Sequence, residues 1–272
     1  MNEEAGAPPS DPAAPVTAAK PRATWRRALG LVRSNIAATM LPLAVIQVPL
    51  GIIGAAAYFY LYHQVYPSAD FESFSRFDDS PNGLILALVL MTAVYLLFSL
   101  VGAAATIVAV RNLLDGKPVK LAESLDPAFT RMGGLLVLGA LFYLLVLATA
   151  AGIVVVLYFI IRWGLAIHAH VLEGTGLGGS LGSSWRVLKG NMLRYIGVLL
   201  TGVPFGLVVF TLASIVFAIF LAPFSSEPGR TASLLAQSLG VLVFGIVAIP
   251  TGAYMATATT IFYLSAKERT RA

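Results

Sequence analysis

Residues 160–195 read IIRWGLAIHAHVLEGTGLGGSLGSSWRVLKGNMLRY and contain each kind of segment from which this chain is built. An apolar run that includes Arg162 ends at Glu173, and a glycine-rich link follows it. A short amphipathic segment around Trp185 then leads into the next apolar run. Partial copies of this order recur along the chain, and the pattern predicts helices that are built into a membrane.

The composition supports a membrane protein. Hydrophobic residues make up 58% of the chain and charged residues only 11%, with a mean hydropathy of +0.83. A soluble domain has about 25% charged residues, so this chain cannot cover a water-facing surface. The chain has no cysteine, which excludes disulfides and thiolate metal sites. The net charge of +5 could suggest a nucleic-acid partner. In a membrane protein, however, the position of the charges along the chain is more informative than their sum, so we expect no nucleic-acid partner.

The first residues, 1–21, are rich in Ala and Pro and lack an apolar run, so we expect a disordered tail and no signal peptide. Residues 22–272 form the predicted membrane domain. Because a helix needs about 20 apolar residues to cross a bilayer, we predict six transmembrane helices, at about 36–62, 83–110, 133–150, 152–172, 195–222 and 234–264. The third and fourth runs are contiguous, so we expect the chain to fold back near residues 149–152.

The basic residues predict the orientation. All but three of the 18 Lys and Arg residues, Arg76, Arg162 and Arg230, fall in segments that lie on one side of this six-helix map. The first loop on the other side is acidic. By the positive-inside rule both termini are expected to be cytoplasmic.

The chain also shows a weak internal repeat. Three segments, around Trp25, Leu125 and Trp185, place apolar residues at i, i+4 and i+7 opposite polar ones. This spacing is typical of a helix lying flat in the membrane interface, although a basic segment beside a membrane helix can show it by chance. We predict three units, at about 22–110, 115–172 and 176–266, each with one interfacial helix and one transmembrane hairpin.

Several short motifs resemble a known family. They are Arg162-Trp163, Glu173-Gly174, Ser183-Ser184-Trp185-Arg186, Gly190, a last apolar run with Pro250, and a basic end at residues 263–271. With these motifs the chain resembles the six-pass membrane domain that is fused to some bacterial glycerophosphodiester phosphodiesterases and that also occurs alone in inner-membrane proteins. The resemblance implies a bacterial cytoplasmic (inner) membrane location. In the fused enzymes a separate soluble domain carries catalysis, so the resemblance implies no enzymatic activity and no cofactor for this chain.

Arg162 is the most informative single residue, because a charge inside an apolar run is costly unless it is paired or hydrated. The expected partners are a loop carboxylate (Glu123, Asp126 or Glu173), a backbone carbonyl, water or an external anion. Glu173 is too far along a helix to reach Arg162 directly. A structural network and an anion or lipid-phosphate site bound by the guanidinium fork both remain open.

Three other sequence patterns are weaker indications of function. His168 and His170 are two residues apart, which argues against joint metal binding on a helix, and we expect no metal site. The glycine-rich link matches a nucleotide-binding pattern but follows a predicted membrane helix and no strand, so we interpret it as a flexible turn. Prolines inside the apolar runs, together with Gln47 and Gln237, would suit either a transport pathway or ordinary helix packing.

We therefore predict an all-α integral membrane protein with six transmembrane helices in three hairpins, each preceded by a cytoplasmic interfacial helix. The leading functional hypothesis is a non-catalytic membrane module that engages anionic phospholipid or a membrane protein partner. The alternative is a small transporter or lipid-moving protein. The candidate lipid- or anion-binding residues are Arg162, Glu173, Arg26, Arg27, Arg186, Lys189 and Arg194.

Overall fold

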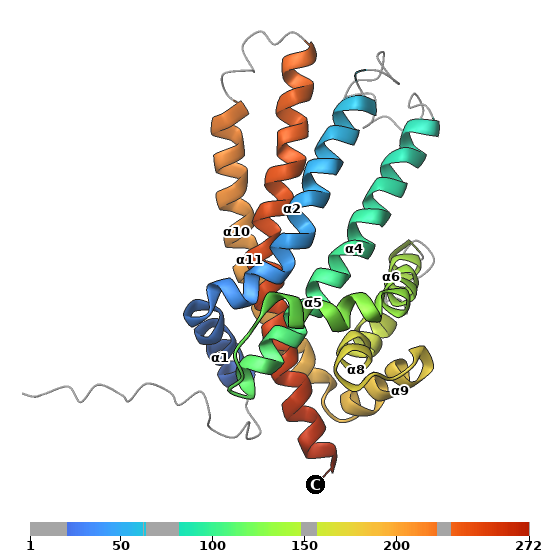
Figure 1. The fold of residues 1–272 in the computed structure, drawn as a ribbon, viewed down its shortest axis with the longest axis vertical. Helices are drawn as coiled ribbons and strands as arrows, with labels where there is room; N and C mark the ends of the chain where they lie inside the picture. The colour runs from blue at the N-terminus through green and yellow to red at the C-terminus, as the bar shows by residue number, and fades with distance from the viewer. Residues whose placement is uncertain (1–20, 62, 64–81, 148–156, 222–229, 272) are drawn as a thin grey trace, which may run out of the picture.

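The computed structural model describes residues 21–61, 63, 82–147, 157–221 and 230–271, and the elements within these ranges are helices (Figure 1). The all-α prediction is therefore confirmed for the described residues. The expected disordered tail and the expected turn near residues 149–152 lie outside them. In chain order the helices are α1 (Pro21–Ser34), α2 (Ile36–Tyr60), α4 (Asn82–Leu114), α5 (Leu121–Thr130), α6 (Met132–Leu147), α8 (Ala166–Glu173), α9 (Leu177–Leu188), α10 (Met192–Leu221) and α11 (Arg230–Arg271).

Four of these helices contain stretches long and apolar enough to cross a membrane. The stretches are Ile36–Tyr60, Val89–Leu114, Met192–Leu212 and Leu235–Thr270, in α2, α4, α10 and α11. A fifth exists if α5 and α6, which meet at a 69° bend, count as one broken span. The chain thus has the helices of a multi-pass membrane protein, with four to five candidate spans among the described residues where the sequence predicted six.

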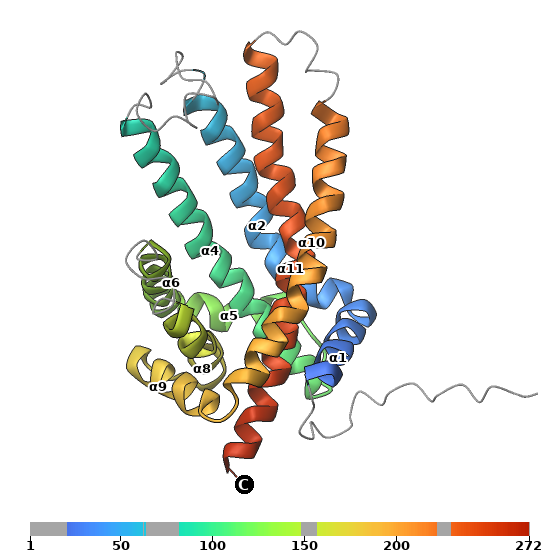
Figure 2. The same cartoon turned by 180° about the vertical axis from the view of Figure 1, so that it is seen from behind.

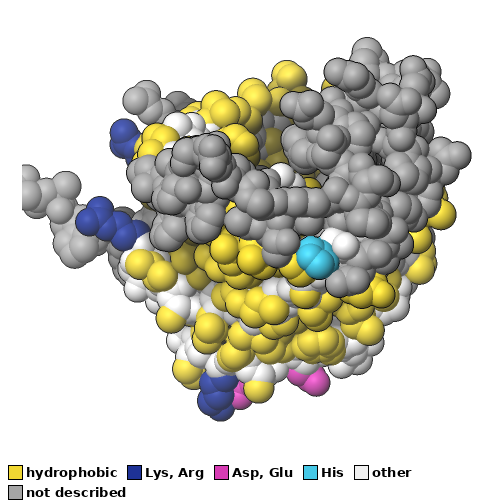
Figure 3. Space-filling model, turned by 90° about the horizontal axis from the view of Figure 1, so that it is seen from above, with side chains coloured by type: hydrophobic (Ala, Val, Ile, Leu, Met, Phe, Trp, Pro, Cys, Tyr) yellow, Lys and Arg dark blue, Asp and Glu magenta, His cyan; other side chains and the backbone are white. Residues whose placement is uncertain are grey.

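The surface of the long helices is apolar. Side chains such as Ile53, Leu90 and Leu207 are more than half exposed, as expected for residues that face lipid. Figure 3 views the molecule from the end opposite the C-terminus, and hydrophobic side chains cover most of the described surface in that view. The short helices α1, α5, α8 and α9 gather at the other end, near the C-terminus (Figures 1 and 2).

Helix α2 packs between α4 and α11, and glycines allow this close approach. A Cβ placed on Gly102 of α4 would lie 3.3 Å from the Leu43 Cα, and one on Gly252 of α11 would lie 3.3 Å from a methyl group of Leu43. Leu43 is only 1% exposed, so its side chain fills the space that the two glycines leave. The Tyr58 hydroxyl also donates to Gln237 Oε1 at 2.9 Å, which is the helix-packing role considered for this glutamine.

The three amphipathic segments are helical, and in α1 and α9 the face packed against the bundle overlaps the predicted apolar stripe only in part. In α1, Ala28 and Val32 are buried whereas Leu29 is 37% exposed. In α9, the buried face includes Ser184 and Leu188, and Trp185 is 37% exposed. Small side chains let these helices lie close to the bundle, and part of the predicted apolar stripe faces outward.

The fourth apolar run differs most from the prediction. Helix α6, Met132–Leu147, covers the described part of the third run, and residues 148–156 lie outside the described residues. The next run was expected to form one helix over 152–172. Its described part is instead helical over 157–163, turns at Gly164 and Leu165, and continues as α8. A Cβ on Gly164 would lie 2.4 Å from the Tyr195 hydroxyl, so glycine is required where the chain turns beside α10.

Candidate functional site

The side chain of Arg162 is held by aromatic rings. Its guanidinium carbon lies 4.1 Å from the ring centroid of Trp185 on α9 and 5.9 Å from that of Tyr158. Tyr158 and Arg162 are four residues apart in the 157–163 helix and therefore share one face. The two rings meet edge to face at 6.0 Å, so together they form an aromatic corner around the cation.

Ser184 determines how α9 and Trp185 sit against this helix. Its hydroxyl donates to the backbone carbonyl of Arg162 at 2.9 Å and accepts from the backbone N–H of Leu165 at 3.2 Å. These two backbone groups flank the turn at which the regular helix is interrupted. Ser184 is fully buried, so a single side chain satisfies both groups away from water.

The guanidinium of Arg162 makes no hydrogen bond to any residue that the structure describes, and its Nε is shielded from solvent without a partner. The three carboxylates considered as partners do not contact it. Glu173 pairs with Lys267, Glu123 pairs with Lys120, and Asp126 makes no ion pair with Arg162. Stacking on the rings is therefore the contact that the protein itself offers to this charge.

Glu173 belongs to a separate cluster. Its Oε1 accepts from the Tyr263 hydroxyl and lies 2.6 Å from the Lys267 Nζ, so α8 is tied to the C-terminal part of α11. Among the described residues Glu173 pairs with Lys267 and not with Arg162, although the two do not lie on one continuous helix as the prediction assumed. Gly174, with φ of 68°, ends α8 in the left-handed conformation immediately after this carboxylate.

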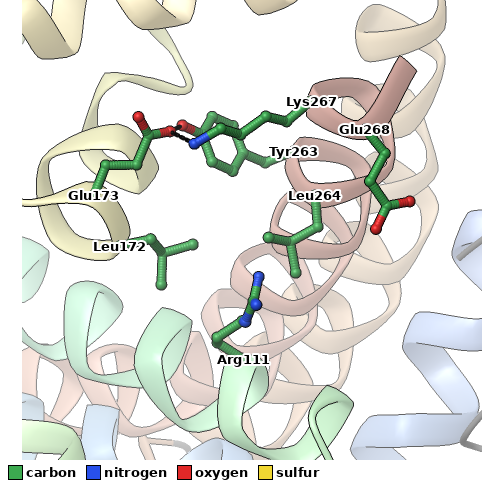
Figure 4. A pocket seen from close by; sticks show the side chains of 7 residues that line it. All are labelled: Arg111, Leu172, Glu173, Tyr263, Leu264, Lys267 and Glu268. Atoms are coloured by element: carbon green, nitrogen blue, oxygen red, sulfur yellow. Dashed lines mark hydrogen bonds and ion pairs between the residues drawn. The ribbon is translucent and has the colours of Figure 1, made fainter. Parts of the chain in front are cut away.

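A cavity of about 370 Å³ opens beside this cluster (Figure 4). Arg111 of α4 points into it while also binding Asp115 at 2.9 Å. Of the residues around this cavity, only Glu173 was predicted as a candidate from the sequence. The i, i+4 spacing of Tyr263 and Lys267 could have indicated that both lie on the same side of α11. The lining residues are Arg111, Leu172, Glu173, Tyr263, Leu264, Lys267 and Glu268.

A third polar cluster was missed by the sequence analysis. Arg131, after α5, donates to the carbonyl oxygens of His170 (3.0 Å) and Val171 at the end of α8. His170 Nδ1 lies 2.8 Å from the Thr175 carbonyl oxygen, and the Thr175 hydroxyl bonds Ser180 Oγ at 2.9 Å. Since Arg131 lies 39 and 40 positions from His170 and Val171, periodicity could not reveal its contacts with them.

The two histidines that drew attention to α8 have different surroundings. The ring of His168 packs at 5.5 Å against that of Tyr263, whereas His170 bonds the backbone around the glycine-rich link. Among the described residues, no group of three His, Cys, Asp or Glu side chains is placed to hold a metal ion.

The remaining candidate basic residues come from α1, α9 and the start of α10. Arg26 and Arg27 are on α1, with Arg26 at 5.9 Å from the Trp25 ring; Arg186 is on α9, Lys189 follows it, and Arg194 is in the first turn of α10. All except Arg27 are exposed. The helices that carry these residues, α1, α9 and the first turn of α10, lie at the end of the bundle near the C-terminus (Figure 2), and none of the five residues lines the cavity beside Glu173.

Residues 143–270 match the family model described as the membrane domain of glycerophosphoryl diester phosphodiesterase. The matched region contains Arg162, Glu173 and Trp185, together with helices α8 to α11. The resemblance inferred from the motifs is therefore confirmed. No curated protein and no solved structure matches the chain.

Proposed function

We propose that this chain, whose residues 143–270 match a phosphodiesterase membrane domain, is a non-catalytic membrane module that engages anionic phospholipid through the basic end of its helix bundle. In this proposal the bundle has six spans in a bacterial inner membrane, and α1, α5 and α9 lie in the cytoplasmic interface. Both termini are cytoplasmic, as the distribution of Lys and Arg favours.

One observation carries the proposal: exposed cations lie next to exposed apolar side chains at this end of the molecule. On α1, Arg26 is exposed and Leu29 is 37% exposed. At the start of α10, Leu193 is 84% exposed beside the exposed Arg194. Apolar side chains that enter the lipid boundary, with Lys and Arg at headgroup level, are typical of surfaces that bind anionic membranes.

The expected attraction for anionic lipid follows from the number of Lys and Arg residues at this end of the bundle. Each Lys or Arg near an anionic surface contributes about 1 kcal/mol. Five such residues therefore concentrate anionic lipid around the bundle without a shaped pocket. A membrane protein partner with an acidic cytoplasmic surface would use the same charges.

The test replaces Arg26, Arg27, Arg186, Lys189 and Arg194 by Gln together. Quantitative mass spectrometry of lipid that co-purifies in mild detergent should show a large loss of anionic phospholipid relative to zwitterionic lipid. The matched control exchanges Arg for Lys and Lys for Arg at the same five positions, which keeps the charge and should keep the lipid. Unchanged anionic lipid in the Gln variant, with an intact size-exclusion profile, would refute the proposal.

A further inference from the structure

Among the cations at this end of the bundle, Arg162 stacks on two aromatic rings while none of its hydrogen-bond donors meets an acceptor among the described residues. Arg269 also has shielded, unpaired nitrogens, but its third nitrogen bonds Asn191 Oδ1 at 3.4 Å. Arg111 binds Asp115, Lys267 binds Glu173, and Arg131 binds two carbonyl oxygens. For Arg162 the described residues provide aromatic rings and no acceptor.

In this arrangement the Arg162 guanidinium has a stacking partner on its face but no hydrogen-bond acceptor at its edge. Stacking on Trp185 compensates the face of the guanidinium plane. It does not use the N–H groups, which lie in the plane and point outward from its edge. A guanidinium deprived of water needs acceptors at that edge, because an unpaired charged donor is costly in an apolar environment.

The edge is also accessible. Of the guanidinium nitrogens only Nε is shielded from solvent without a partner, so the two terminal nitrogens can be reached from outside. The rings beside them are open as well, with Trp185 37% and Tyr158 39% exposed. Trp and Tyr side chains concentrate at headgroup level in membranes, so the same depth is expected for the donors.

We propose that Arg162, backed by Trp185 and Tyr158, is a discrete binding site for the phosphate group of one membrane phospholipid. The two terminal nitrogens donate to two non-bridging phosphate oxygens, for which the planar fork of arginine is well shaped. The acyl chains of the lipid then lie along the exposed apolar side chains near this corner, such as Leu157, which is 47% exposed. This site deepens the proposed function, and it can fail or hold independently of the five dispersed cations.

The experiment counts phosphatidylglycerol bound to the full chain by native mass spectrometry during titration with defined lipid. Arg162→Gln should lower the affinity of the tightest lipid roughly tenfold or more, the effect of losing a bidentate charge-assisted contact. Arg162→Lys retains the charge and loses the fork, so most of this decrease should remain. Trp185→Phe retains an aromatic face and should bind nearly as wild type does, whereas Trp185→Leu should weaken binding severalfold.

The matched control is Arg33→Gln, which removes an exposed positive charge from α1 that belongs neither to the Arg162 site nor to the five-residue basic surface. It should leave the tightest lipid in place. Equal losses in Arg33→Gln and Arg162→Gln would show general charge attraction and overturn the site while leaving the proposed function standing. Conversely, loss in Arg162→Gln but not in the five-residue Gln variant would support the site and refute the dispersed basic surface.

Titration with inorganic phosphate distinguishes a lipid phosphate from free phosphate as the group that Arg162 binds. Thermal stability in detergent should rise with phosphatidylglycerol in wild type, much less in Arg162→Lys, and little with inorganic phosphate in either. If inorganic phosphate stabilises wild type as strongly as the lipid does, the lipid assignment is wrong. An identical lipid-induced shift in wild type and Arg162→Lys would overturn the site itself.

Discussion

Ser184→Ala is the most direct test of how the protein forms the turn that carries Arg162. The hydroxyl of Ser184 is fully buried and serves two backbone groups, the Arg162 carbonyl at 2.9 Å and the Leu165 N–H at 3.2 Å. Alanine removes the hydroxyl and leaves both groups without that partner. A buried polar group that loses its hydrogen bond costs about 1–3 kcal/mol, so we expect a total loss of roughly 2–4 kcal/mol.

For a chain of this size, 1 kcal/mol shifts the melting temperature by about 2–4 °C. Ser184→Ala should therefore lower the melting temperature in detergent by roughly 5–10 °C, measured by the loss of the monodisperse size-exclusion peak after heating. Intrinsic fluorescence should change as well, because α9 positions Trp185 over Arg162.

The adjacent serine provides the control. Ser183 is 6% exposed, and its hydroxyl makes no hydrogen bond with the described residues. Ser183→Ala has the same change in helix propensity, which is worth at most about half a kcal/mol. Melting temperatures for the two variants within 1 °C of each other would refute the role assigned to Ser184.

Four further predictions concern a close glycine contact, two ion pairs and the topology. A Cβ on Gly134 would lie 2.3 Å from the His170 Nε2 whereas Gly133 has open space around it, so Gly134→Ala should lower the melting temperature by several degrees and Gly133→Ala should not. Glu173→Gln and Lys267→Met should show a coupling of about 1 kcal/mol in a double-mutant cycle of thermal stability, and a value near zero would show that the ion pair does not stabilise the fold. The exposed pair Lys120–Glu123 should give less than about 0.5 kcal/mol in the same assay. For topology, Gly182→Cys on the exposed surface of α9 should resist a membrane-impermeant thiol reagent in intact cells while Ser68→Cys reacts, and the reverse pattern would invert the proposed orientation.

Helix length and apolarity were enough to identify the membrane-spanning helices that the structure supports. Crossing a bilayer places a requirement on consecutive residues, so it can be read along the chain. The stretches in α2, α4, α10 and α11 fall within the predicted runs or close to them. The same rule failed to describe residues 152–172, because the turn at Gly164 depends on Tyr195 and Ser184 from other helices.

The candidate site was predictable in part. An arginine in an apolar run identified Arg162, and a carboxylate at a helix end identified Glu173. Their partners were not predictable, because Trp185 and Lys267 come from helices that the turn and the bundle bring close. The amphipathic pattern placed Trp185 on an apolar stripe expected to face the membrane interface, and its indole is 37% exposed but also covers Arg162, which the pattern did not predict.

The break in the helix also explains how the protein tolerates an arginine without a carboxylate. In one continuous helix over 152–172, Arg162 would lie ten residues from the end, about 15 Å at 1.5 Å per residue. At that depth an unpaired guanidinium would cost several kcal/mol. The helix instead ends one residue after Arg162, at the turn of Gly164 and Leu165. Helix α9 lies alongside this turn, where Ser184 binds the Arg162 carbonyl and Trp185 covers the Arg162 side chain. The charge thereby lies beside α9, where aromatic rings stabilise its face. If α9 lies in the membrane interface as proposed, lipid phosphate groups are available to the edge of the guanidinium.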